Sequence, residues 1–134
     1  MSLRLTLIIH SLNGGGAERT AAFMANYWSE AGKDVTLLTL DTAANDKYPI
    51  ASEVERVGLD LMGHSRSLTQ AIWNNFRRWR RLRSAIRSAR GDVVISFTDK
   101  MNVLTLLASP VRSVIVCERT DARRHAIGRV WSVL

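Results

Sequence analysis

The chain has 134 residues, enough for one domain that buries its own core. Hydrophobic residues make up 46% of it, which excludes an intrinsically disordered protein, and its single cysteine excludes an internal disulfide. The formal net charge is +7 and 16 of the 19 basic residues are arginine, so we expect an anionic partner: a phosphorylated ligand, acidic lipid or nucleic acid.

Short apolar runs alternate along the chain with longer segments of helical period. The near-continuous apolar runs predict strands buried on both faces; they are Leu5–His10, Val35–Leu40, a weaker Val54–Val57, Val93–Phe97 and Val114–Cys117. The helical segments between them are Ala17–Ala31, Leu68–Ala89 and Lys100–Ser109, and Gly91 is expected to end the second one in a left-handed conformation. This alternation predicts an α/β fold, a Rossmann-like doubly wound and mostly parallel sheet with functional loops at the carboxyl ends of its strands.

Three consecutive glycines, Gly14, Gly15 and Gly16, follow the first predicted strand and directly precede a helix. Glycine adopts backbone angles that are closed to other residues, and it lets a ligand approach the main chain. The free N–H groups and the dipole of the following helix favour an anion at this place. We therefore expect the turn to receive an anionic group such as a diphosphate; a tight turn without a ligand is the alternative.

Three familiar kinds of site fit the sequence poorly. No Gly-Lys-Ser/Thr follows the glycines, so the turn is not a P-loop. A nicotinamide dinucleotide fingerprint would need a third glycine where Arg19 stands, and Asp41, placed like a ribose-binding acid, is equally a turn starter. The histidines, His10, His64 and His125, lie far apart and no metal-ligand spacing repeats, so we expect neither a metal nor another cofactor.

The second predicted helix is strongly basic. Between residues 61 and 91 there is no acidic residue, while one apolar stripe runs along the helix and is expected to face the sheet; it consists of Ile72, Phe76, Trp79, Leu82, Ile86 and Ala89. The arginines expected to contact an anionic membrane or a pyrophosphate are Arg77, Arg78, Arg80, Arg81 and Arg87. A merely solvated basic face is one alternative. Nucleic acid, reached through the interleaved aromatic residues, is another, but no nucleic-acid motif is present and we do not expect it.

Several motifs carry a resemblance to a known family. Gly15-Gly16-Ala17-Glu18-Arg19 follows the first strand, and Asp92-Val93-Val94-Ile95-Ser96-Phe97 and Val114-Ile115-Val116-Cys117-Glu118-Arg119-Thr120-Asp121 come later in the matching order and spacing. Together they resemble the N-terminal domain of the retaining glycosyltransferases of family 4, which have the GT-B fold. The resemblance implies a cleft between two Rossmann-like domains. The residues of these motifs that would line the cleft, together with neighbouring positions in the sequence, are the substrate-binding candidates: His10, Gly14, Gly15, Gly16, Glu18, Arg19, Thr98, Asp99, Glu118 and Arg119.

For three of these candidates a structural role is the alternative. Glu18 also suits the dipole of the first helical turn, Arg19 could pair with a surface carboxylate, and His10 could be a satisfied structural histidine. No catalytic residue is assigned.

The resemblance also implies a reaction and a place. Such enzymes move a sugar from a nucleotide-sugar donor to a lipid-linked or surface-polysaccharide acceptor, in polysaccharide biosynthesis, and we expect this protein to be cytoplasmic and peripheral on the inner face of the membrane. They need a second, donor-binding domain with a Glu-x7-Glu-like motif, which residues 1–134 do not contain. We therefore expect residues 1–134 to be the acceptor-side domain, a fragment inactive as an isolated half and able to self-associate through its exposed cleft face. The alternative is a non-catalytic basic α/β module that binds anionic membrane or nucleic acid.

Overall fold

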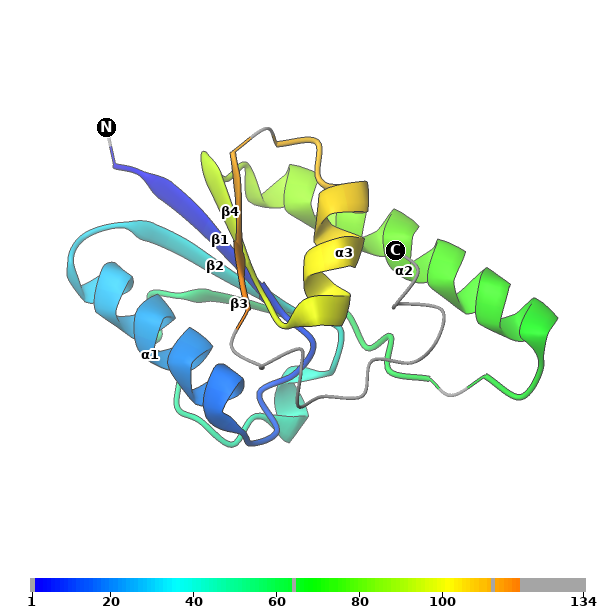
Figure 1. The fold of residues 1–134 in the computed structure, drawn as a ribbon. Coiled ribbons are helices and arrows are strands. Elements are labelled where there is room, and N and C mark those ends of the chain that lie inside the picture. Colours follow the sequence, from blue (N-terminus) through cyan, green and yellow to red (C-terminus); the bar gives the residue numbers. More distant parts are fainter. Residues whose placement is uncertain (1, 64, 112, 119–134) are drawn as a thin grey trace.

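The computed structural model describes residues 2–63, 65–111 and 113–118, and its strands form one parallel sheet (Figure 1). The strands are β1 (Arg4–Ile9), β2 (Asp34–Thr39), β3 (Glu55–Gly58), β4 (Val93–Phe97) and β5 (Val114–Cys117). Their order is β3-β2-β1-β4-β5, and every neighbouring pair is parallel. The predicted Rossmann-like, doubly wound sheet is thereby confirmed.

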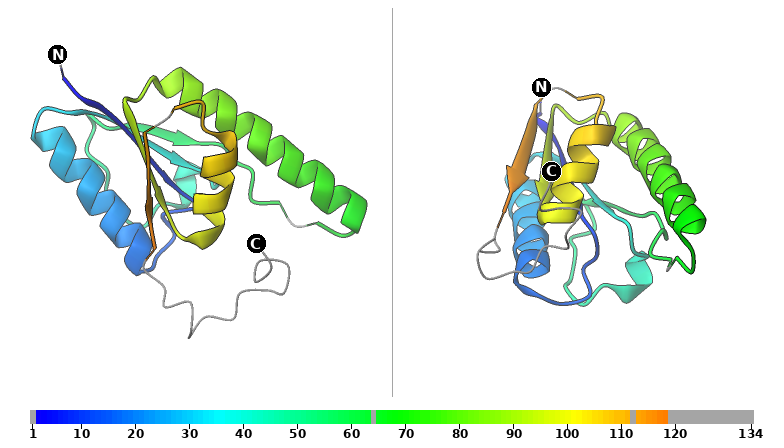
Figure 2. Two further views of the ribbon diagram at one scale, coloured as in Figure 1. Left: turned by 45° about the horizontal axis from the view of Figure 1, so that its top comes forward. Right: turned by 45° about the vertical axis from the view of Figure 1, so that its right-hand side comes forward.

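Helices cover both faces of this sheet. Helix α1 (Gly16–Glu30) lies on one face, while α2 (Leu68–Ala89) and α3 (Asp99–Ala108) lie side by side on the other (Figures 1 and 2). The connection between β2 and β3 contains only a short 3-10 helix, η1 (Ala43–Asn45). The crossover from β3 to β4 is made by α2, which moves the chain to the opposite face and the opposite half of the sheet.

The sheet separates two apolar cores. Alternate residues of each strand point to opposite faces, so β1 and β2 contribute to both. Beneath α1 the core contains Leu5, Leu7, Ile9, Leu12, Ala21, Ala22, Ala25, Val35, Leu37, Val54, Ile95 and Phe97. Beneath α2 and α3 it contains Ile8, Leu38, Leu40, Leu61, Leu82, Ile86, Val94, Met101 and Ala108.

The apolar stripe of α2 faces the sheet only in its C-terminal half. Leu82 and Ile86 are buried, and half-buried Trp79 donates its indole N–H to the Leu107 carbonyl at 3.0 Å. Ile72 and Phe76, by contrast, are 63% and 49% exposed. The expectation that the whole stripe packs inward is therefore wrong for the N-terminal half, because this part of α2 reaches beyond the sheet (Figure 2).

A smaller expectation is corrected at the C-terminal end of α2. Arg90, with φ 52°, is the left-handed residue that ends α2, in place of Gly91. Gly91 is needed for another reason, because a Cβ there would collide with the Thr6 hydroxyl. Cys117 is half-buried against the core under α1. Among the described residues, no helix is both long and apolar enough to cross a bilayer.

Candidate functional site

The candidate site lies where the direction of the chain connections reverses, between β1 and β4. The chain leaves β1 towards α1 on one face and leaves β4 towards α3 on the other, so the carboxyl ends of these two strands are the position at which open α/β sheets bind ligands. We call this edge, between the glycine turn and Thr98, the crevice. His10 follows β1 and Thr98 follows β4, at neighbouring positions of this edge. The structure thus brings the glycine turn and the Thr98–Asp99 pair to one edge of the sheet.

The carboxylate of Glu18 closes the N-terminal end of its own helix. Its Oε1 lies 3.2 Å from Nε2 of His10, and the residue is 8% exposed. A Cβ on Gly15 would collide with this carboxylate, and Gly15 has φ 122°, a conformation that side chains rarely adopt. Glu18 is therefore folded back over the turn, where its charge also interacts favourably with the helix dipole.

The loop before β3 braces the glycine turn, which the sequence did not predict. The Tyr48 hydroxyl accepts a hydrogen bond from the Gly15 N–H at 3.2 Å and donates one to the Gly15 carbonyl at 3.1 Å. The Lys47 N–H donates to the Leu12 carbonyl at 2.9 Å. Asn26 of α1 holds the same loop through two more hydrogen bonds. A tyrosine in a loop carries no sequence signal that distinguishes this bracing role from a surface position.

The opposite side of the crevice has a strained backbone. Thr98 has φ 75° and ψ 149°, a region that is almost restricted to glycine. Its N–H donates to the Cys117 carbonyl at 3.2 Å, and the Asn102 amide donates to the same carbonyl at 3.3 Å. Asn102 is 8% exposed, so these contacts hold the ends of β4 and β5 together from within. Residues kept in such conformations cluster at functional sites.

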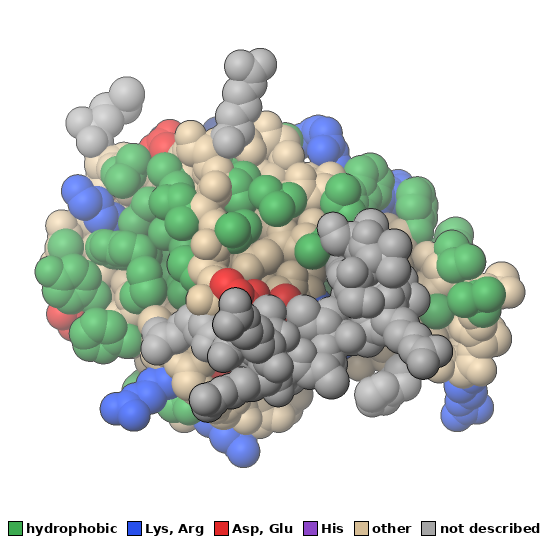
Figure 3. Space-filling view, in the orientation of Figure 1, with side chains coloured by type: hydrophobic (Ala, Val, Ile, Leu, Met, Phe, Trp, Pro, Cys, Tyr) green, Lys and Arg blue, Asp and Glu red, His purple; other side chains and the backbone are tan. Residues whose placement is uncertain are grey.

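The remaining candidates are less well defined. Arg19 is exposed on α1, Asp99 accepts a hydrogen bond from the Lys100 N–H at 2.8 Å, and Glu118 is exposed just after β5. Arg119 lies outside the described residues, as do His64 and His125. In Figure 3 acidic side chains lie near the centre of this face and at its left and upper-left rim, and basic side chains lie mainly around the periphery.

Asp41 has the turn role that was the alternative to a ribose contact. Its carboxylate accepts hydrogen bonds from the Thr42 N–H at 2.8 Å and from the Asn45 amide at 3.0 and 3.2 Å. These donors fix η1 directly after β2. The acid thus has local partners that account for its position.

The arginines of α2 differ in their surroundings. The guanidinium of Arg78 donates to the carbonyls of Leu61 at 3.0 Å and Gly63 at 2.8 Å, so it supports the loop before the helix. Arg87 is exposed in the last turn. The other three candidates border a groove of about 350 Å³ along the helix, whose lining is Trp73, Phe76, Arg77, Arg80, Arg81 and Ser84.

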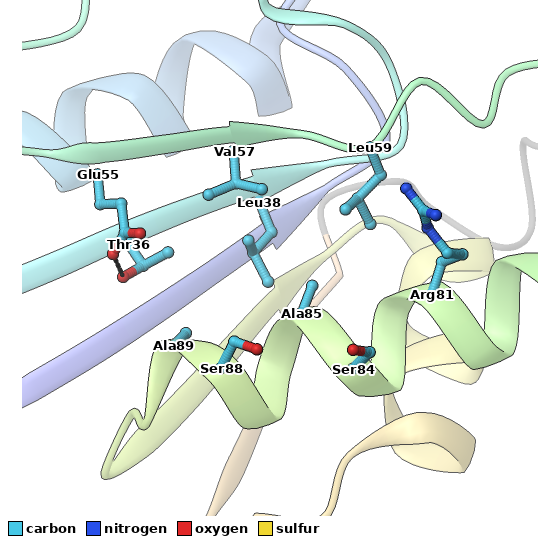
Figure 4. A pocket seen from close by; sticks show the side chains of 10 residues that line it. All are labelled: Thr36, Leu38, Glu55, Val57, Leu59, Arg81, Ser84, Ala85, Ser88 and Ala89. Carbon is cyan, nitrogen blue, oxygen red and sulfur yellow. Dashed lines mark hydrogen bonds between the residues drawn. The ribbon is translucent and has the colours of Figure 1, made fainter.

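A second hollow, of about 320 Å³, lies away from the crevice (Figure 4). Small side chains of α2, such as Ser84 and Ser88, face Leu38 and Val57 of the sheet across it, and Glu55 pairs with the Thr36 hydroxyl at 3.3 Å. None of the candidate substrate-binding residues lines this hollow. Across the described ranges, no group of three or more His, Cys, Asp or Glu side chains could hold a metal ion.

Comparison with known proteins points to sugar transfer. The chain is 25% identical over 133 residues to the GalNAc-alpha-(1->4)-GalNAc-alpha-(1->3)-diNAcBac-PP-undecaprenol alpha-1,4-N-acetyl-D-galactosaminyltransferase of Campylobacter jejuni. This similarity supports a glycosyltransferase role. It covers 98% of the chain and 36% of the relative, so the chain spans little more than a third of that enzyme's length. No protein-family model matches the chain.

The crevice of this glycosyltransferase-like chain offers hydrogen-bonding groups rather than a ready nucleophile. The Glu18 carboxylate is an acceptor, and the His10 imidazole can accept or donate. The His10 side chain is 37% exposed, so the pair can be reached from solvent. This arrangement can orient hydroxyl groups, and it can hold a proton close to one of them.

Proposed function

We propose that the chain is the acceptor-side domain of a glycosyltransferase of the GT-B type, similar to family 4. The observation that carries the proposal is the contact of 3.2 Å between His10 and Glu18 at the carboxyl ends of β1 and β4. Ligands of open α/β sheets bind at this place. The similarity to a galactosaminyltransferase over 98% of the chain supports the same function.

In this proposal, the acceptor's terminal sugar lies in the crevice between the glycine turn and Thr98. Glu18 and His10 orient its hydroxyl groups, while the nucleotide-sugar donor comes from a second domain outside residues 1–134. The relative's name gives a polyprenyl diphosphate that ends in N-acetylgalactosamine as its substrate. We extend that chemistry to this chain: its acceptor is a lipid-linked glycan, or a surface polysaccharide, with a terminal N-acetylhexosamine.

Helix α2 would then contact the membrane that carries the acceptor. Its N-terminal half exposes Trp73 (64%) and Ile72 (63%), and Arg77 and Arg80 border the groove that Trp73 lines. Aromatic side chains enter the headgroup region of a bilayer, while arginines pair with phosphate groups of lipids or of the acceptor's pyrophosphate. In this proposal the protein is peripheral on the cytoplasmic face of the membrane.

The exposed aromatic and arginine side chains of α2 also favour a second candidate function. A basic α/β module without catalytic activity could use the same helix to bind an anionic membrane or single-stranded nucleic acid. In that case the His10–Glu18 pair would have only a structural role.

Flotation with liposomes tests the role of α2. The wild-type chain should float with liposomes that contain acidic phospholipid and stay behind with neutral ones, and R77A/R80A should lose most of this binding. The double variant R4A/K33A is the matched control, because it removes two exposed charges at the opposite end of the strands. Equal flotation of both variants would remove α2 from the proposal, and preferential binding to single-stranded nucleic acid would favour the non-catalytic module.

A transfer assay tests the glycosyltransferase role itself. The protein as its gene encodes it is incubated with labelled nucleotide sugars and a lipid-linked glycan. Transfer of label to the glycan is expected, with a large loss in E18Q. If no label is transferred from any nucleotide sugar, the proposed function is wrong.

A further inference from the structure

We infer that Arg56 and Asp46 position the glycine turn of the candidate site and thereby influence the affinity for the acceptor. The inference rests on the proposed function, and it assigns a role to two residues that lie outside the crevice. Arg56 belongs to β3, and Asp46 directly follows η1. Strand β2 separates β3 from β1, after which the glycine turn begins. Any influence on the turn therefore has to pass through the loop between β2 and β3.

The contact between the two side chains is bidentate and largely shielded from water. Nε of Arg56 donates to one carboxylate oxygen of Asp46 at 2.8 Å, and Nη2 donates to the other at 2.7 Å. The two side chains are 12% and 16% exposed, respectively. Two parallel hydrogen bonds fix the direction of the carboxylate as well as its distance. The pair thus fastens the loop to a strand of the sheet.

The two residues that follow Asp46 connect the pair to the turn. The Lys47 N–H donates to the Leu12 carbonyl at 2.9 Å, directly before the glycines. The Tyr48 hydroxyl then contacts both backbone groups of Gly15. Because Tyr48 is only two positions from Asp46, a displacement of Asp46 would move the tyrosine and with it the turn.

A stabilising role alone accounts poorly for this pair. Nη1 of Arg56 is buried and has no hydrogen-bond partner among the described residues. Burial of both charges is costly, and apolar side chains of similar volume in place of such a pair often leave stability unchanged or raise it. A bidentate ionic contact, however, adds geometric specificity that an apolar contact lacks. The pair therefore serves the geometry of the loop more than its stability.

A double variant separates positioning from stability. D46L/R56M replaces the pair by apolar side chains, and its midpoint of urea denaturation should equal or exceed that of the wild type. The backbone amide signals of Gly14–Gly16 should nevertheless shift in nuclear magnetic resonance spectra of the protein with isotope-labelled glycine. In the transfer assay, the KM for the acceptor glycan should rise about tenfold while kcat changes less, because a displaced turn weakens acceptor binding.

Three further variants complete the experiment. E55Q is the matched control, because Glu55 precedes Arg56 but faces the α2 side of the sheet, and it should behave like the wild type (Figure 4). L82A lowers stability through the core beneath α2 and should leave the turn signals and the KM unchanged. D46N keeps the size of Asp46 but places an amide donor against the guanidinium. It should shift the same signals, and it replaces the double variant if that variant does not fold.

The outcomes distinguish this inference from the proposed function. If the folded double variant, or D46N in its place, keeps the wild-type turn signals and KM, the inference is overturned and the proposed function stands. An equal rise of KM in L82A would also overturn it, because any loss of stability would then have the same effect. If the wild-type protein transfers no sugar, both are overturned.

Discussion

The hydroxyl of Tyr48 bonds to both backbone groups of Gly15, accepting from its N–H at 3.2 Å and donating to its carbonyl at 3.1 Å. The two residues are 33 positions apart, and they join the loop before β3 to the start of α1. Because Gly15 precedes the first helical residue, this contact sets the direction in which α1 leaves the sheet. It also holds the turn in the conformation that brings Glu18 to His10.

Removal of that hydroxyl should loosen the turn. We expect Y48F to lower the free energy of unfolding by about 0.5–1.5 kcal/mol, the usual net contribution of a hydrogen bond. Tyr27 is 60% exposed on α1, so Y27F is the matched control and should change stability very little. Urea denaturation measures both, and equal effects of the two substitutions would mean that the Tyr48 contact contributes nothing.

The two neighbouring glycines should respond differently to alanine. G15A places a Cβ against the Glu18 carboxylate at φ 122°, and we expect a loss of about 1–3 kcal/mol in the free energy of unfolding. G16A meets no atom within 4 Å and should leave stability unchanged or raise it by about 0.4–1 kcal/mol. Chemical denaturation of both variants checks the prediction, which a tolerated alanine at position 15 would contradict.

Relief of the backbone strain at Thr98 should raise the free energy of unfolding. T98G should raise the free energy of unfolding by about 1 kcal/mol, because glycine adopts φ 75° and ψ 149° without the steric cost that threonine has. T98A is the matched control, since it shortens the side chain but keeps its Cβ and therefore the strain. Thermal unfolding distinguishes them: a T98G variant no more stable than T98A would show that this backbone is not strained.

Substitutions in the two halves of α2 should affect different properties: the C-terminal half stability, and the N-terminal half membrane binding. L82A removes a buried side chain and should cost about 2–5 kcal/mol of unfolding free energy. W73A removes a side chain that is 64% exposed, so stability should change by no more than about 0.5 kcal/mol while flotation with acidic liposomes weakens. A W73A chain that floats like the wild type would show that the exposed half of α2 does not bind lipid.

The sheet was predictable because buried parallel strands are near-continuous apolar runs. β4 and β5 have the predicted bounds, and β1 and β2 differ from theirs by one residue at each end. Helix α2 shows the limit of such reasoning. Its period predicts an apolar face correctly, but how far the helix extends past the sheet depends on the length of the strands opposite.

The site was predictable only in part, for a related reason. The sequence marks the ends of β1 and β4, and therefore His10 and Thr98 at the edge of the sheet. It does not reveal that Glu18 folds back over Gly15, or that Tyr48 and Asn102 hold the two loops. Those contacts join residues distant in the sequence or depend on side-chain direction, and neither leaves a pattern of spacing.

The most direct test of the acceptor-side role is the affinity of the chain for its acceptor in a membrane. Binding is measured to nanodiscs of one acidic lipid composition that carry either a polyprenyl diphosphate with a terminal N-acetylhexosamine or the same polyprenyl diphosphate without sugar. The account predicts tighter binding to the glycan-bearing nanodiscs, and loss of this difference in E18Q but not in E30Q. Equal affinity of the wild-type chain for both kinds of nanodisc would contradict it.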